Sequence, residues 1–238
     1  MSANNKEITK DNLEELLKKV AREFRKANRG VTVEVILVGG AAVLANYGFR
    51  QSSGDVDAYT NAFSALKDAA NKVGDEEGLP NGWFNSDFRK TRSYSPKIMQ
   101  YSKYYKTFYN VLEVRTMSGA HLIAMKLMSG RQFKNDLTDI IGVLAEESER
   151  GNNLTLEDIQ KAFSDLYGEW DKIPDESAKF IEICFSGESF STLYSKYESY
   201  QGDVKNKLID FEEKYPAVVD NDNVDDIIRR LMSDDRER

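Results

Sequence analysis

Cysteine and histidine are nearly absent from this chain of 238 residues, which holds one of each, Cys184 and His121. A disulfide within the chain is therefore excluded, and so is a zinc centre built from cysteines and histidines. So little cysteine is typical of a reducing compartment, and we expect a cytoplasmic protein. We expect Cys184 to be an unreactive residue on an apolar helix face, and His121 to be a partly buried helix residue rather than a base.

Long apolar runs are also missing. The longest lies around residues 35–45 and is too short to cross a bilayer, and the first residues lack the apolar core of a signal peptide. We therefore expect no membrane partner. The glycine-loop patterns GxxxxGK[ST] and GxGxxG and the nucleophile pattern GxSxG do not occur either, which argues against P-loop, dinucleotide-binding and serine-hydrolase classes.

Positive charge is scarce in the last part of the chain. Residues 1–150 carry 22 Lys/Arg and 19 Asp/Glu, whereas residues 151–238 carry 11 and 21. A polyanion would approach the first part and avoid the second. The acidic residues of the second part are expected to form a solvated helical surface or a docking site. The composition changes near residue 150, so we predict one domain over residues 1–150 and a helical domain over residues 151–238.

The most informative stretch runs from residue 33 to residue 59. Residues 33–38 are apolar and β-branched, as in a buried strand, and Gly39-Gly40 ends it. Residues 41–47 favour a short helix, and residues 54–59 return as a strand. Such a glycine turn at a helix start exposes backbone N–H groups that favour phosphate.

Two aspartates mark the second of these strands. Asp55 and Asp57 alternate with Val56, so both carboxylates point to one face while Val56 points to the core. Their Cα atoms would lie about 6.6 Å apart. Paired carboxylates favour Mg²⁺, so the stretch predicts a metal–nucleotide site. The alternative is a βαβ turn with two solvated aspartates.

This ordered set of strand, Gly-Gly, helix and Asp-x-Asp strand resembles the signature of the nucleotidyltransferase superfamily. The form GGAAVL followed by GFRQSSGDVD resembles its AbiEii-type branch, which includes toxins of bacterial toxin–antitoxin pairs. The resemblance covers about residues 30–145. It implies an α+β fold with a mixed sheet flanked by helices and followed by a helical region, a nucleoside triphosphate substrate, one or two Mg²⁺ ions, and a cognate antitoxin as a partner.

A second run, LIAMKLMSGRQFKNDLTDI, resembles the same branch, in which a helix lysine precedes an arginine and a paired-aspartate helix. The matching positions are Lys126, Arg131, Asp136 and Asp139. The resemblance implies that Lys126 contacts nucleotide phosphates and that Asp136 completes the catalytic centre, and we expect Arg131 to bind the nucleotide. A structural Arg131–Asp136 ion pair is the alternative. At 100° per residue Asp136 flanks the buried stripe of its helix and Asp139 lies nearly opposite, which favours Asp136.

The remaining candidate ligands lie in the first stretch and on a later strand. We expect Gly39, Gly40 and Ser53 to hold the triphosphate through backbone N–H and hydroxyl groups, and Arg50 to bind a phosphate or orient the aspartates. Glu113, on a strand predicted over residues 110–117, is the candidate third metal ligand. Arg115 shares its face, so a simple ion pair is the alternative.

Residues 88–112 contain six Lys/Arg, five tyrosines and no acidic residue. Cations beside aromatic rings are what single-stranded RNA binding needs. The alternative is a β-meander, because tyrosine favours strands and lysine protects strand edges. The preceding segment, residues 83–87, is assigned no role.

Helices are predicted over several further segments by their apolar spacing: residues 8–28, 61–77, 119–129, the segments after Thr155 and Pro174, 189–215 and 223–232. Two functions remain open. The chain is either an enzyme that transfers a nucleoside monophosphate to an RNA 3′ end such as that of tRNA, a protein hydroxyl or a small molecule, or a catalytically silent module that binds a nucleotide or a partner protein.

Overall fold

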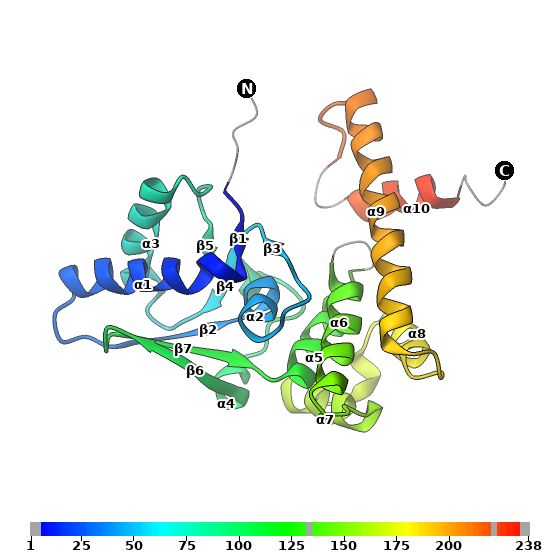
Figure 1. Cartoon of the computed structure of the whole chain (residues 1–238), viewed down its shortest axis with the longest axis horizontal. Helices are drawn as coiled ribbons and strands as arrows, with labels where there is room; N and C mark the ends of the chain where they lie inside the picture. The colour runs from blue at the N-terminus through cyan, green and yellow to red at the C-terminus, as the bar shows by residue number, and fades with distance from the viewer. Residues whose placement is uncertain (1–5, 132–134, 220–222, 234–238) are drawn as a thin grey trace.

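A mixed β-sheet with helices around it is followed by a group of C-terminal helices in the computed structural model, which describes residues 6–131, 135–219 and 223–233 (Figure 1). The strands are β1 (Ile8–Thr9), β2 (Val33–Leu37), β3 (Ser52–Ser53), β4 (Val56–Tyr59), β5 (Phe84–Asn85), β6 (Ser102–Phe108) and β7 (Leu112–Met117). The helices are α1 (Lys10–Ala27), α2 (Gly39–Asn46), α3 (Phe63–Glu77), α4 (Ile98–Tyr101), α5 (Gly119–Ser129), α6 (Asp136–Glu149), α7 (Leu156–Tyr167), α8 (Asp175–Cys184), α9 (Phe190–Lys214) and α10 (Val224–Ser233), with short 3₁₀ turns η1 (Asp87–Lys90) and η2 (Trp170–Lys172).

The main sheet has the strand order β5-β4-β2-β7-β6. β2 lies at its centre, antiparallel to β4 with Ile36 opposite Tyr59, and parallel to β7 with Val33 opposite Leu112. The apolar run that predicted a buried strand forms β2. It is buried because strands pair with it on both sides. The predicted α+β fold with a mixed, helix-flanked sheet and a helical C-terminal region is confirmed.

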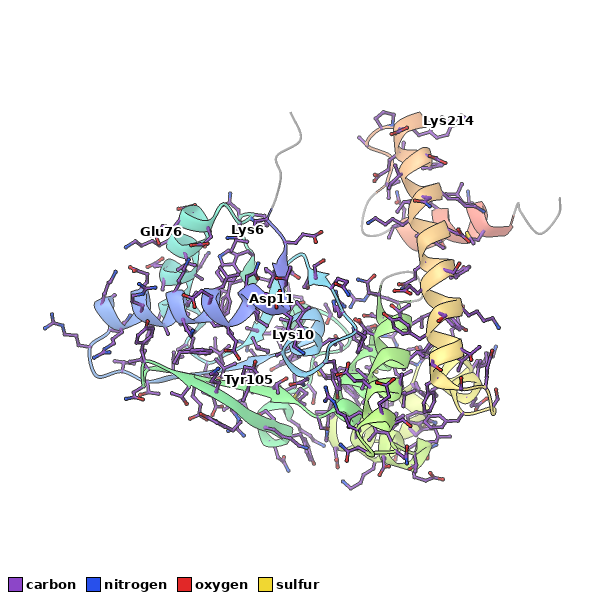
Figure 2. All side chains as sticks on the ribbon, viewed as in Figure 1. Lys6, Lys10, Asp11, Glu76, Tyr105 and Lys214 are labelled. Carbon is purple, nitrogen blue, oxygen red and sulfur yellow. The ribbon has the colours of Figure 1, made fainter. Side chains whose placement is uncertain are left out.

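Helix α1 forms where its apolar spacing predicted, and its apolar stripe is buried. Thr9 begins it with a capping box, in which the Thr9 backbone N–H donates to Asn12 Oδ1 at 2.9 Å. Strand β6 reaches the same helix, since the Tyr105 hydroxyl donates to Glu14 Oε1 at 2.8 Å (Figure 2). The buried stripe consists of Leu13, Leu16, Leu17, Val20, Ala21 and Phe24.

Helix α6 lies between α5 and α9, and this position corrects one expectation. The residues Asp136–Leu144 are all buried, without the single-sided pattern of a surface helix. The prediction that Asp139 lies opposite the buried side is therefore wrong, because α6 is covered on more than one side. Helices α5 and α6 also pack with α7 and α9, across residue 150, so the domain boundary there stays a prediction.

The segment over residues 88–112 is less regular than a β-meander. Only β6 is a long strand, and η1 and α4 precede it. Ser95 fixes the irregular part, because its buried hydroxyl donates to the Leu166 carbonyl oxygen at 2.6 Å. The alternative of a β-meander over the whole stretch therefore does not hold, since η1 and α4 occupy its first part. Every helix in the part of the chain that the structure describes is too short or too polar to span a bilayer.

Candidate functional site

A pocket of about 360 Å³ lies where the sheet meets helices α5 and α6. Its volume falls in the range of small-ligand sites. One wall comes from the end of β2, the start of α2 and β4, and it carries Gly39, Asp55 and Asp57. Another comes from α5 and the segment leading into α6, with Lys126, Arg131 and Asp136. The residues after β5 close a further side with Asp87, Phe88, Thr91 and Ser93.

Asp55 and Asp57 reach the pocket because of strand geometry. Val56 begins β4 and is fully buried, so its two neighbours point away from the core. Gly39 has φ +57°, a conformation that favours glycine, and a Cβ added there would lie 3.4 Å from Asp57 Oδ2. The Asn85 amide donates to Asp55 Oδ2 at 2.8 Å and holds that carboxylate. The structure thus brings together Gly39 and both aspartates.

Burial raises the pKa of Asp57 from its usual 3.8 to about 6, and the Asp55 carboxylate adds to the rise while Arg131 opposes it. A divalent cation between the two carboxylates would offset this repulsion, so the pair fits such an ion. Mg²⁺ is commonly held by one or two carboxylates together with substrate phosphates. Among the described residues no group of three or more His, Cys, Asp or Glu is arranged to hold a metal, so phosphate oxygens would have to complete the coordination.

The raised pKa of Asp57 predicts a pH-dependent stability without metal. Between about pH 4 and pH 6 the folded protein keeps a proton on Asp57 that the unfolded chain releases, because the folded pKa is higher. This contribution is fully present below pH 3.8 and is lost as pH rises through about 6, with a total of up to about 3 kcal/mol. Urea unfolding in chelator across this interval should show that Asp57→Asn gains stability relative to wild type as pH rises. The exposed control Asp68→Asn should not; parallel pH profiles of wild type and Asp57→Asn would contradict the prediction.

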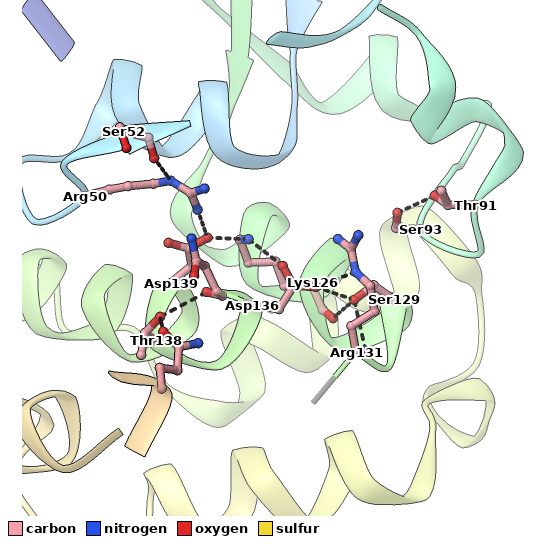
Figure 3. A network of polar contacts seen from close by, with 12 residues as sticks. Arg50, Ser52, Thr91, Ser93, Lys126, Ser129, Arg131, Asp136, Thr138 and Asp139 are labelled. Carbon is pink, nitrogen blue, oxygen red and sulfur yellow. Dashed lines mark hydrogen bonds and ion pairs between the residues drawn. The ribbon is translucent and has the colours of Figure 1, made fainter. Parts of the chain in front are cut away.

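Lys126 is the centre of a buried charge network (Figure 3). Its side chain is 7% exposed, and its Nζ lies 2.9 Å from Asp136 Oδ1 and 2.6 Å from Asp139 Oδ2. Asp136 also accepts hydrogen bonds from the Ser129 hydroxyl at 2.8 Å and from Arg131 Nε at 2.9 Å. A lysine inside an apolar helix needs an anion, and α6 supplies two. The Arg131–Asp136 ion pair that was the structural alternative is present.

These contacts keep the network ionised. Burial opposes ionisation of Asp136, but Lys126 and Arg131 outweigh it and lower the pKa of Asp136 to about 2. Burial likewise opposes the charged form of Lys126, but Asp136 and Asp139 raise its pKa above the ordinary value. At neutral pH Lys126 therefore carries a full positive charge at the pocket wall.

Arg50, Gly40 and Ser53 lie behind the pocket and do not line it. Arg50 forms an ion pair with Asp139, and its Nε donates to the Ser52 carbonyl oxygen at 2.9 Å. A Cβ on Gly40 would lie 2.5 Å from Ser53 Oγ and 2.9 Å from Arg50 Nη2. Glycine is thus needed at position 40 because these side chains press on the first turn of α2.

Glu113 is not part of this site. It is opposite Glu34 in the β2–β7 register, and Arg115 Nη1 lies 3.2 Å from its carboxylate. Asp57 is level with Val38, since the Val38 N–H donates to the Asp57 carbonyl oxygen. Four residues of strand separate Glu34 from Val38, about 13 Å. The expectation of a third metal ligand at Glu113 therefore fails, and the ion-pair alternative describes this residue.

The segment after β5 contributes residues that the sequence did not single out. Asp87 lines the pocket and adds to the rise of the Asp57 pKa. Arg89 anchors the segment, with its guanidinium 5.2 Å and 5.8 Å from the ring centroids of Tyr59 and Tyr94. β5 has two residues, too few for a periodic pattern, so only its pairing with β4 reveals this wall.

One comparison with known proteins gave a match. Searches of curated proteins and of solved structures gave no match. The family model described as a nucleotidyltransferase of unknown function (DUF6036) matches residues 12–168, which include β2, the Asp-x-Asp strand, α5 and α6. The match covers more than half of the chain, and the chain therefore belongs to this nucleotidyltransferase family.

Proposed function

We propose that the protein transfers a nucleoside monophosphate from a nucleoside triphosphate to an acceptor hydroxyl in the pocket between β4 and α5. One observation carries the proposal: the carboxylates of Asp55 and Asp57 and the cations of Lys126 and Arg131 line the same pocket. Carboxylates suit a divalent cation and the cations suit phosphate oxygens. Such a pairing of opposite charges matches a metal-bound triphosphate.

Asp55 and Asp57 would hold Mg²⁺, which when bound neutralises phosphate charge and lowers the pKa of the attacking hydroxyl. The backbone N–H groups at the start of α2, next to Gly39, would bind phosphate oxygens at the helix N-terminus. The acceptor oxygen attacks the α-phosphorus and gives its proton to water, while the bond to the bridging oxygen breaks and pyrophosphate leaves. Gly40 and Ser53 pack at this turn and support it. Arg50 also packs there and links the turn to α6 through its ion pair with Asp139.

Lys126 and Arg131 would offset the charge that builds on the departing pyrophosphate. Arg131 is the more accessible of the two, with 43% of its side chain exposed. Asp136 accepts from both cations, so we assign it a positioning role rather than direct contact with the nucleotide.

RNA is the acceptor class that the chain's composition favours, through residues 88–112, and a protein hydroxyl is the other candidate. Within that stretch Thr91 and Ser93 line the pocket, and Tyr104 has 61% of its surface exposed. The AbiEii-type branch, a toxin role, a cognate antitoxin and a cytoplasmic location stay predictions from the sequence.

A transfer assay tests the proposal. The purified protein would be incubated with Mg²⁺ and each labelled nucleoside triphosphate in turn, with total RNA and cell lysate as acceptors. We expect label in RNA with one or more of the nucleotides, and none in chelator. Label in protein would keep the enzyme and change its acceptor. If no acceptor takes label but a nucleotide binds equally well without Mg²⁺, the protein is a catalytically silent binding module and the proposal fails.

A further inference from the structure

A second groove, of about 600 Å³, lies at the opposite end of β2 from Gly39. The end of α1 forms one side, with Arg22, Arg25, Lys26 and Arg29, and the turn between β6 and β7 forms the other, with Tyr109 and Asn110. None of the residues that line it is acidic. This concentration of cations contrasts with the net charge of −7 over the whole chain.

Arg22, Arg25 and Arg29 lack a counterion in the part of the chain that the structure describes. Among the described residues none of them forms an ion pair or a hydrogen bond through its side chain, and all three are exposed. Arg22 and Arg25 stand three positions apart on α1, so their like charges are neighbours on the helix surface at some cost in stability, and Arg29 follows the end of the helix. Compensation of the helix dipole accounts for Arg25 and Lys26 in the last turn, but not for Arg22 or Arg29.

An aromatic ring stands over the same groove. Tyr109 is 44% exposed, and both Tyr109 and Asn110 have positive φ, +52° and +54°. Asparagine tolerates this conformation, but for tyrosine it is uncommon and costs free energy. The turn therefore keeps a strained tyrosine at its tip, where a smaller residue would fold more easily, and presents its ring beside the arginines.

We propose that this groove binds the phosphate backbone of a single-stranded RNA, with one base stacked on Tyr109. Arginines neutralise phosphates, and an exposed ring stacks bases of any sequence. A concave groove follows a strand of nucleic acid better than it meets a flat bilayer. β2, which is five residues long, separates the groove from the pocket by about 17 Å. That this RNA is the acceptor rests on the proposed transfer function, whereas the binding itself does not.

The salt dependence of RNA affinity tests the groove. We would measure the dissociation constant of a labelled single-stranded RNA at several salt concentrations for wild type and for Arg22→Gln/Arg25→Gln/Arg29→Gln. Glutamine keeps the helix propensity of arginine, so α1 should persist, as circular dichroism can check. We expect affinity at low salt to fall about tenfold or more, and the slope of log K against log salt to shrink by about 2, for three lost phosphate contacts on a single strand.

A matched control carries the same change in net charge elsewhere. Lys179→Gln/Lys196→Gln/Lys205→Gln removes three exposed cations from α8 and α9 and should leave the slope unchanged. Tyr109→Asn keeps a residue that accepts positive φ but removes the ring, and we expect affinity to fall about fivefold or more with no change in slope.

Equal slopes for the two triple variants would overturn the proposal, and so would wild-type binding to vesicles of anionic lipid that exceeds binding to RNA. Asp57→Asn separates this inference from the transfer function, because it should bind RNA as wild type does. Groove-dependent binding without any transfer would support the groove and reject the proposed enzyme. If the arginine variant transfers nucleotide to RNA at the wild-type rate and binds RNA with the wild-type affinity, the proposed enzyme is supported and the groove is rejected.

Discussion

Nucleotide transfer by the Asp57→Asn variant should fall by on the order of a thousandfold or more relative to wild type, about 4 kcal/mol of transition-state stabilisation. Asparagine keeps the shape of the side chain but supplies one neutral oxygen where a metal ion would meet a carboxylate. Among the described residues no group of three or more His, Cys, Asp or Glu is arranged to hold a metal, so the loss of one carboxylate of this pair should be severe.

The same substitution should stabilise the metal-free protein at neutral pH, since burial and Asp55 both disfavour the ionised Asp57. A variant that is inactive yet more stable separates a role in chemistry from a role in folding. Melting temperatures with and without Mg²⁺ add a second readout, in which wild type should respond to Mg²⁺ more than the variant. Transfer at the wild-type rate by Asp57→Asn would remove this pair of aspartates from the active site, whereas Asp68→Asn should remain fully active.

Lys126→Met should lower the free energy of unfolding by about 3–5 kcal/mol, as expected when one partner of a buried ion pair is removed. Two carboxylates, Asp136 and Asp139, each at most 4% exposed, would lose their shared cation. Methionine preserves the volume of the stem, so the loss reports charge and not a cavity. Urea unfolding at neutral pH measures it.

A double variant shows whether charge balance is the cause. In Lys126→Met/Asp136→Asn, Asp139 keeps its ion pair with Arg50, and the buried negative charge that faced Lys126 from Asp136 is removed together with the lysine. We expect this double variant to be more stable than Lys126→Met alone by about 1–3 kcal/mol, the cost of a buried polar group that has lost its partner. A double variant that is as unstable as the single one would show that packing, not charge, determines the effect.

Local pattern predicted the parts of the fold that local forces determine. The spacing of leucines in α1, the apolar run of β2 and the glycine pair that begins α2 each specify their element without distant partners. The alternation around Val56 likewise places Asp55 and Asp57 on one side, and the structure brings them to the pocket. For these features the spacing of apolar and polar residues along the chain is sufficient to predict the structure.

Distant contacts determined what the sequence missed. A helical wheel assumes that one face of a helix is covered, whereas α6 is covered by both α5 and α9. The helical-wheel prediction therefore misplaced Asp139. Glu113 has the right residue type on a strand of the main sheet, but its register places it at the wrong end. Asp87 enters the pocket only because a two-residue strand pairs with β4. Register and helix packing depend on pairings that composition does not encode.

Asp139 joins parts of the chain that meet only in three dimensions. It pairs with Lys126 on α5 and with Arg50 in the loop after α2, so one carboxylate connects the helical half of the pocket to the sheet half (Figure 3). Removal of this one carboxylate would therefore leave two cations on different parts of the chain, Lys126 and Arg50, each with one counterion fewer.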